Sequence, residues 1–245
     1  MDGSLPDRPS DPDDPLRNRL LAALLPAEFE RLRPGLEPIE LTRGGVLHEC
    51  GGALRHAYFP TTAVVSLLSV LRSGASAEFA FVGPEGMIGL TLVMGGDTMP
   101  SRAVAQKAGR IWRLERRLLV REFERGGTLQ GGLLRYTHAL LVLVAQAAAC
   151  NRHHTVEQQL CRWLLMSLDR ARSSELAVTQ ELIASMLGVR REGVTEAAGR
   201  LQRAGLIAYR RGLIRVPDRS RLEAHACECY DVGRKAFAQL HAVRP

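Results

Sequence analysis

Two short helical patterns separated by a single glycine, within residues Thr179 to Ile207, constrain this chain more than any other stretch. The first pattern repeats apolar residues at i, i+1, i+4 and i+5, a spacing that puts them on one helical face. These residues are Leu182, Ile183, Met186 and Leu187. Gly188 follows and can take the left-handed conformation that ends a helix. The second pattern places Val194, Ala197 and Leu201 on one face, so the stretch predicts two helices joined by a tight turn.

The second helix has a polar face directed away from its apolar positions. Its members are Arg191, Glu192, Thr195, Glu196 and Gly199. A recognition helix presents such a face to base edges in the major groove of DNA. Helical hairpins also occur in ordinary protein cores, so this pattern alone leaves a core hairpin open as the alternative.

The residues after the hairpin favour DNA binding. Leu206 to Tyr209 and Leu213 to Val216 read as two strands around the turn Arg210-Arg211-Gly212, which would form a wing. Between Thr179 and Arg221, nine arginines and four acids leave a net charge of plus five, as phosphate neutralisation requires. The predicted DNA-binding residues are Thr179, Gln180, Arg190, Arg191, Glu192, Thr195, Glu196, Arg200, Arg210 and Arg211.

Charge and cysteine usage over the whole chain bound its class. The 245 residues carry a net charge of +7, which favours an anionic partner, although a general arginine bias weakens this argument. Five scattered cysteines predict no disulfide framework and a reducing cytoplasm. The longest apolar run, Ala139 to Cys150, falls short of a membrane span, so we expect no membrane partner. The acidic, proline-rich residues 1–19 predict a mobile tail and no export signal.

Short apolar runs punctuated by glycine occupy Leu36 to Leu114 and predict a β-barrel, roll or sandwich. The expected strands include one at Met87 to Leu90, and Arg72 to Ala75 is the expected hairpin turn. Helical spacing precedes this region at Leu20 to Leu32, where Pro26 marks a break. Glu115 to Glu124 is expected to form a short charged helix.

A long apolar helix is predicted from Leu133 to about His153. Its apolar surface is wider than one intramolecular stripe needs, which favours pairing with a second copy of the chain. The predicted dimer interface consists of Leu133, Thr137, Leu140, Val144, Ala147 and Asn151. A central helix packed on the β region is the alternative.

Three further segments complete the C-terminal part. Thr155 to Asp169 predicts an amphipathic helix with Thr155 as its N-cap. Arg172 to Glu175 is expected to be a linker, and Arg221 to Leu240 a single helix.

This order of parts resembles the CRP/FNR superfamily of bacterial transcription regulators over about Leu20 to Val216, most specifically in LGVRREGVTEAAGRLQRAGLI. The resemblance implies an α+β fold: a tail at residues 1–19, a cyclic-nucleotide-binding-like β-roll (jelly roll) at 20–125, a dimerisation helix at 126–154 and a winged helix-turn-helix at 155–245. It implies a homodimer on a pseudo-palindromic operator, and contact with RNA polymerase if the protein is an activator. It also implies that Arg191 bonds guanine and Glu192 accepts from cytosine. Glu196 stands where the family often has a third base-reading arginine, so we expect a different half-site.

The sensor region departs from the family members that bind cyclic AMP. The residues that match their pocket are Gly86, Ile88, Gly89, Leu90, Ser101 and Arg102. Leu90 stands in place of the glutamate that holds the ribose. Arg102 matches the family's phosphate-binding arginine only if the preceding loop is aligned in a different register. We therefore expect an effector other than cyclic AMP, with no cofactor predicted.

Metal chemistry is not expected from the sequence. Cys227 and Cys229 are too close together to hold a metal by themselves and have no partner pair nearby, which predicts a structural role. One cysteine before Cys150 argues against an iron-sulfur cluster. Haem binding stays open as an alternative, because His48, His56, His138, His153 and His154 include candidate axial ligands, although the sequence selects no particular one. The rival function is a cupin-like metalloenzyme using His48, Glu49 and His56, although the spaced ligand set of such a site is missing.

Overall fold

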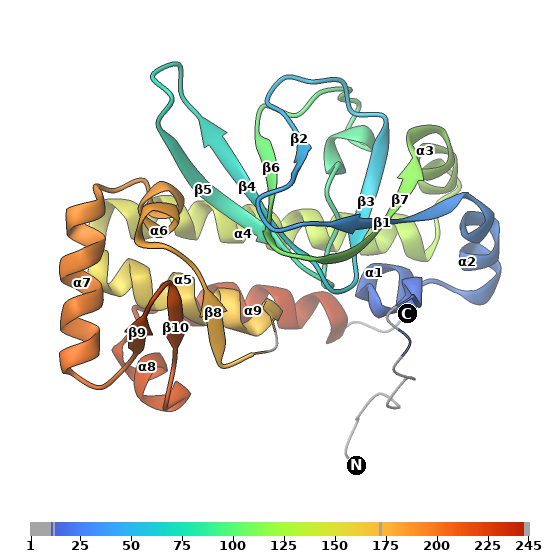
Figure 1. Ribbon diagram of the computed structural model, residues 1–245. Helices are drawn as coiled ribbons and strands as arrows, with labels where there is room; N and C mark the ends of the chain where they lie inside the picture. The colour runs from blue at the N-terminus through green and yellow to red at the C-terminus, as the bar shows by residue number, and fades with distance from the viewer. Residues whose placement is uncertain (1–10, 12, 172, 243–245) are drawn as a thin grey trace, which may run out of the picture.

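The computed structural model of the protein describes residue 11, residues 13–171 and residues 173–242. An N-terminal β domain lies above one long helix, and a smaller helical domain with its own three-stranded sheet follows (Figure 1). The expected tail at residues 1–19 lies partly outside the described residues. Its last part is ordered, because Asn18 is fully buried and its Nδ2 donates to Pro60 O at 3.0 Å and to Gly86 O at 2.8 Å. The expectation of mobility is wrong for this part.

Seven strands build the β domain as two antiparallel sheets, ordered β1-β7-β3 and β2-β6-β4-β5. The strands are β1 (Leu36–Leu41), β2 (Val46–His48), β3 (His56–Pro60), β4 (Val64–Val70), β5 (Ser76–Val82), β6 (Arg102–Lys107) and β7 (Gly109–Glu115). Three helices flank them, α1 (Arg19–Ala22), α2 (Pro26–Leu32) and α3 (Arg116–Glu124). The expected strand at Met87 to Leu90 is wrong: only Ile88 bridges to Tyr58, and Gly89, at φ 98°, turns the chain into a 3-10 helix.

The remaining elements follow the predicted order with two corrections. They are α4 (Thr128–His153), α5 (Val156–Ala171), β8 (Glu175–Ala177), α6 (Gln180–Leu187), α7 (Arg191–Arg203), β9 (Ala208–Arg210), β10 (Leu213–Arg215), α8 (Arg219–His225) and α9 (Cys229–Ala242). The expected linker ends in strand β8, which pairs with β10 and makes the wing sheet three-stranded. The expected single C-terminal helix is two helices, with Ala226 in extended conformation between them.

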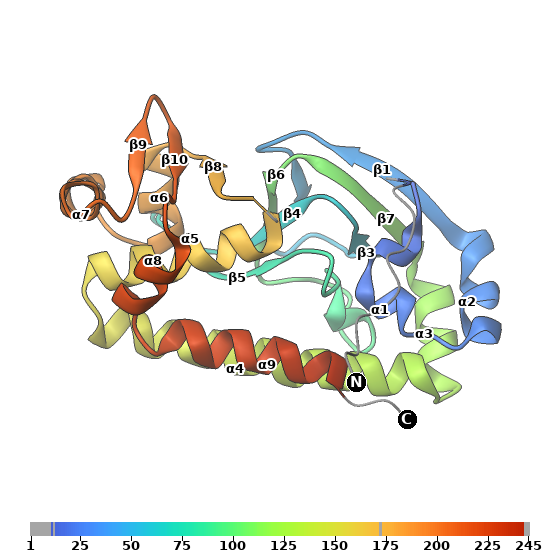
Figure 2. The same ribbon diagram turned by 90° about the horizontal axis from the view of Figure 1, so that it is seen from below.

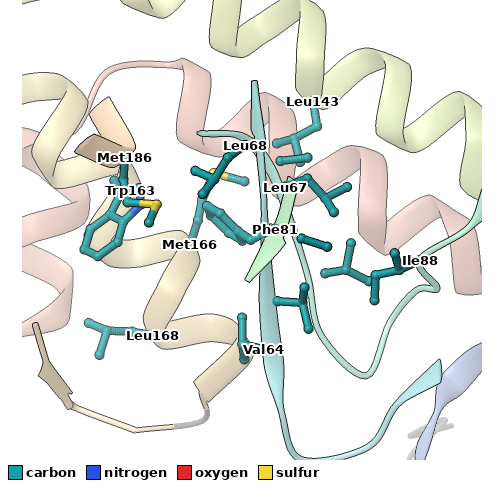
Figure 3. Packing of buried hydrophobic residues seen from close by; sticks show 14 of the residues in the cluster. Val64, Leu67, Leu68, Phe81, Ile88, Leu143, Trp163, Met166, Leu168 and Met186 are labelled. Carbon is teal, nitrogen blue, oxygen red and sulfur yellow. The ribbon is translucent and has the colours of Figure 1, made fainter. Parts of the chain in front are cut away.

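One continuous hydrophobic core joins the β domain to the helical domain. Figure 3 shows Val64 and Leu67 of β4 and Phe81 of β5 gathered with Leu143 of α4 and Trp163 of α5. Met186 extends the same core into α6. Because the two domains share buried side chains, movement of one against the other must repack this core.

Helix α4 packs on one side only. It lies along β5 and antiparallel to α9, where the rings of Tyr136 and Phe237 lie 6.4 Å apart (Figure 2). By length and composition alone α4 could cross a membrane, contrary to the expectation from the short apolar run Ala139 to Cys150, but a third of its most apolar window is buried within the protein. Its apolar character therefore has a structural explanation in these contacts.

A buried carboxyl group at the contact of the two domains predicts a pH dependence of stability. Glu78 of β5 is 8% exposed, and Trp163 Nε1 donates to its Oε1 at 2.9 Å. Burial raises the pKa of Glu78 to about 7 from an ordinary value of 4.5. Between these values the unfolded chain releases a proton that the folded protein keeps, so the free energy of unfolding falls as pH rises, by roughly 3 kcal/mol at most.

The Glu78→Gln variant isolates this contribution, since glutamine keeps the acceptor for Trp163 and does not ionise. We expect urea unfolding to show a smaller loss of stability in the variant than in the wild type between pH 4.5 and 7. Glu37→Gln, at an exposed carboxylate of β1 paired with Arg113, serves as the control. Equal pH profiles for wild type and Glu78→Gln would show that Glu78 does not titrate in this range.

Candidate nucleic-acid interface

Local backbone chemistry forms the helix-turn-helix as predicted. Thr179 caps α6, because its Oγ1 accepts from Leu182 N at 3.2 Å. Gly188 ends that helix in the left-handed conformation at φ 66°. Arg190 then takes an extended conformation as the N-cap residue of α7. The predicted role of the glycine is confirmed.

The packing of the hairpin decides which side of α7 faces outward. Val194, Ala197, Ala198 and Leu201 of α7 are buried, and Ile183, Ala184, Met186 and Leu187 of α6 are buried with them. The side chains of Arg191, Glu192, Thr195 and Glu196 are exposed on the other side. The first turn of α7 therefore presents a polar surface with two acids and two neutral or basic groups.

The wing is a tight hairpin whose tip carries an arginine. Arg210 pairs with Leu213, so only Arg211 and Gly212 form the turn. Both have positive φ angles, 50° and 76°, as a two-residue hairpin turn of the favoured type requires. The exposed Arg211 side chain projects from the tip of the hairpin.

A surface groove joins the wing to the two helices. It is lined by Thr179, Gln180, Glu181, Arg191, Tyr209, Arg211 and Gly212. The fold thus brings together four predicted residues from segments that are up to 32 positions apart. Thr195 lies at the same place, because its Oγ1 donates to Gln180 Oε1 at 2.8 Å.

Sequence reasoning missed Tyr209 and Glu181 in this groove. The Tyr209 hydroxyl donates to Val178 O at 3.0 Å, which ties the wing to the start of α6. An aromatic residue next to the arginine pair of the wing was the available signal for Tyr209. No pattern in the sequence pointed to Glu181, whose placement depends on how α6 packs beside the wing.

The positive charges divide into paired and unpaired groups. Within the described part of the chain, six arginines between Thr179 and Arg221 make no ion pair: Arg190, Arg191, Arg203, Arg210, Arg211 and Arg221, the last of which donates to the backbone oxygen of Ala204. Arg200 differs, since its Nε bonds Glu157 Oε2 of α5 at 2.6 Å. In this structure Arg200 makes an ion pair between α7 and α5, and its contact with DNA stays a prediction.

The predicted effector residues do not surround an open space at Gly86. The ring of Tyr136 lies so close that an added Cβ at Gly86 would be 2.4 Å from it, and the Tyr136 hydroxyl donates to Met87 O at 3.1 Å. Ile88 and Ser101 are buried, and Leu90 begins the 3-10 helix that follows Gly89. Arg102 forms an ion pair with Glu49 at 3.2 Å.

The predicted dimer interface on α4 needs correction. Leu133 and Ala147 are buried within the protomer, and Thr137, Leu140 and Val144 are half-buried, so only Asn151 of the predicted set is exposed. The exposed apolar side chains lie on the adjacent face, one residue further along at each step, where Leu134 is 58% and Leu141 is 63% exposed. The error arose because the sequence shows the width of an apolar surface but not which half of it the protomer covers.

The two metal expectations have different outcomes. Among the described residues, His48, Glu49 and His56 do not converge into a ligand group. His48 is buried, which lowers its pKa, and Glu49 is paired with Arg102. The expectation that Cys227 and Cys229 lack a partner pair is wrong, because the fold places Cys150 and His154 beside them.

Comparisons with known proteins agree with this arrangement. The model of the cyclic nucleotide-binding domain matches residues 38–125, and that of the Crp-like helix-turn-helix domain matches residues 158–225. A search of curated proteins found no match.

Solved structures of similar fold cover most of the chain. One is a structure from Eubacterium rectale assigned to the CRP/FNR family (18% identity, TM-score 0.66, 85% of this chain and 97% of that chain). A second is FixK2 from Bradyrhizobium japonicum (18% identity, TM-score 0.65, 78% of this chain and 98% of that chain). A third is a CRP-family transcriptional regulator from Thermus thermophilus (22% identity, TM-score 0.65, 77% of this chain and 96% of that chain). At these identities the likeness shows a shared fold.

Proposed function

Since the chain belongs to the CRP/FNR family of transcriptional regulators, we propose that it acts as a homodimer that reads a pseudo-palindromic DNA site. The observation that carries this proposal is the groove between α7 and the wing, with Arg191 and Arg211 on its walls. Arginines there can bond phosphates from the wing and a base edge from α7. The exposed first turn of α7, from Arg191 to Glu196, supplies the groups that read sequence.

A second copy of the chain is needed to cover the exposed face of α4. Leu134, His138, Leu141, Ala145, Ala148 and Arg152 follow one another at alternating steps of four and three, and all six are exposed. That spacing is the heptad spacing of two-stranded coiled coils. A parallel pair of α4 helices would place two recognition helices for the two halves of a palindrome.

The β domain, we propose, responds to an effector other than cyclic AMP or serves as a fixed scaffold. A cyclic nucleotide needs a cation for its phosphate and an acceptor for its ribose. Leu90 supplies no acceptor, Arg102 is engaged by Glu49, and Tyr136 covers Gly86. These three features oppose binding of the ordinary ligand.

The proposal places the protein in the cytoplasm, where bacterial transcription takes place, with RNA polymerase as a partner if it activates. It acts by binding and has no enzymatic activity. The six arginines between Thr179 and Arg221 that make no ion pair within the described chain supply the charge that DNA association requires.

Selection of genomic fragments by the purified protein, followed by fluorescence anisotropy, tests this function. We expect one preferred sequence with two inverted half-sites. Affinity should fall by about 1,000-fold or more between roughly 50 and 200 mM salt, since a dimer that neutralises several phosphates releases their counterions. A scrambled fragment of equal length is the control. Equal affinity for both fragments, with little dependence on salt, would contradict the proposal.

A further inference from the structure

Three cysteines and one histidine converge where the central helix meets the C-terminal helices. Cys150 lies in the last turn of α4 and His154 is its C-cap residue, while Cys227 lies between α8 and α9 and Cys229 is the first residue of α9. Their ligand atoms all lie within 4.8 Å of one another. We propose that these four residues bind one structural zinc ion, Zn²⁺, that fastens the C-terminal helix α9 to the end of α4.

Two distances within this cluster match those around a single tetrahedral ion. The sulfur atoms of Cys150 and Cys227 are 3.7 Å apart, and Cys229 Sγ is 3.4 Å from His154 Nδ1. Two thiolates at about 2.3 Å from one zinc ion lie about 3.8 Å apart in tetrahedral geometry, and a thiolate and an imidazole nitrogen about 3.5 Å. Three cysteines and one histidine are a common ligand set of closed structural zinc sites.

Neighbouring groups hold these side chains in the orientation that a metal requires. Glu228 Oε2 lies 3.5 Å from His154 Nε2, so a carboxylate faces the ring nitrogen opposite to the one in the cluster. Such a carboxylate orients a zinc-bound histidine and fixes its tautomer. Gln146 Nε2 donates to Cys229 Sγ at 3.1 Å, as an amide donates to a metal-bound thiolate.

Burial separates this site from a chance meeting of surface residues. Cys150, Cys227 and Cys229 are buried and form a cluster apart from the main hydrophobic core. These thiols lie apart from the main apolar core and near the buried, positively charged Arg162. Binding of a metal ion by three thiolates accounts for this arrangement better than apolar packing does, because the negative thiolates would be stabilised by the arginine.

Other cysteine chemistry fits the geometry less well. The 3.7 Å between Cys150 Sγ and Cys227 Sγ is far from the bond length of a disulfide. An iron-sulfur cluster spreads its four protein ligands over two or more iron atoms and therefore needs ligands farther apart than this compact group.

The position of the site explains what the ion would do. Cys150 and His154 belong to the joint between α4 and α5. The other two ligands lie just before and at the start of α9, which runs back along α4 (Figure 2). One ion would therefore link segments that are 77 residues apart in the chain. This role is independent of DNA recognition and would hold even if the proposed function failed.

Metal content of the full-length protein tests the proposal directly. We expect about one zinc per chain in protein purified from zinc-supplemented cells without metal-affinity resin, measured by elemental mass spectrometry. Chelation should lower Tm, and added zinc should restore it. Replacement of zinc by Co²⁺ should give the visible absorption of a tetrahedral thiolate site.

Matched variants separate loss of the metal from loss of the fold. Cys227→Ser should lose zinc, and chelator should no longer change its Tm, whereas Cys50→Ser at an exposed cysteine should keep the full stoichiometry. His154→Cys should retain zinc, bound by four thiolates. If His154 only packed against its neighbours and did not bind zinc, this result would not be expected. Glu228→Gln should weaken zinc affinity about tenfold.

Three results would overturn the proposal. The first is wild-type protein without stoichiometric zinc and without the Co²⁺ thiolate spectrum. The second is a Cys150–Cys227 disulfide in freshly purified protein, seen by mass spectrometry. The third is full zinc content in a folded Cys227→Ser variant, whose secondary structure is checked by circular dichroism.

Discussion

Replacing Leu141 by glutamate is expected to convert the proposed dimer into a monomer. Leu141 is 63% exposed in the protomer, at the middle of the heptad positions of α4. Burial of a leucine contributes about 1.5–3 kcal/mol, and a symmetric dimer contains the position twice. The substitution removes both contributions and brings two carboxylates together, so dimerisation should weaken by about 1,000-fold or more.

Sedimentation velocity and light scattering measure this change against the chain mass of 26.9 kDa. Leu71→Glu is the matched control, because Leu71 is 62% exposed at the tip of the β4–β5 hairpin, away from α4. The Tm of both variants should remain near that of the wild type, since neither side chain is buried in the protomer. A Leu141→Glu protein that stays dimeric would show that the subunits meet through another surface. In the monomer, affinity for an operator should fall sharply, because each half-site is then bound independently.

Removing the Arg191 side chain is expected to reduce base preference strongly while leaving the fold intact. Arg191 is exposed at the first residue of α7 and borders the groove with the wing. An arginine bonded to a guanine edge contributes about 1–3 kcal/mol of discrimination, and a dimer uses it in both half-sites. Affinity of Arg191→Ala for the preferred site should therefore fall by about 30-fold or more, with little change for a scrambled site.

Two other arginines give the contrast that makes this result specific. Arg211→Ala should weaken binding to all sequences, since the wing tip would contact phosphates. The slope of affinity against salt concentration should fall by about one released counterion per protomer. Arg200→Ala should leave base preference unchanged, because Arg200 is held by Glu157 of α5. If Arg191→Ala lowered affinity equally for both sites, Arg191 would be a phosphate contact and not a base reader.

Local signals in the sequence were sufficient for the helix-turn-helix. Thr179 caps a helix, Gly188 ends it, and the apolar spacing of α7 separates a buried face from an exposed one. Each of these depends on residues within a few positions, where capping and periodicity act. The long helix was predicted for the same reason, and it spans Thr128–His153.

Residues whose role depends on distant partners were predicted less well. Arg200 looked like a DNA contact because it lies on the recognition helix, but Glu157, 43 positions away, binds it. The dimer face was placed on the half of α4 that the protomer itself covers with β5 and α9. Gly86 looked like part of a ligand pocket, and the ring of Tyr136, 50 positions later, lies against it.

The sequence by itself determined the kind of protein: periodicity, capping and turn residues specify a β region, a long helix and a winged helix-turn-helix, because these properties are written in neighbouring residues. Only the tertiary structure decided which faces remain free and which side chains meet. Cys227 and Cys229 show the difference most clearly. They form a pair without partners in the sequence, and the packing of α9 along α4 places Cys150 and His154 beside them. Metal ligands need proximity in space, which spacing along the chain does not specify when one half of the set is more than 70 residues from the other.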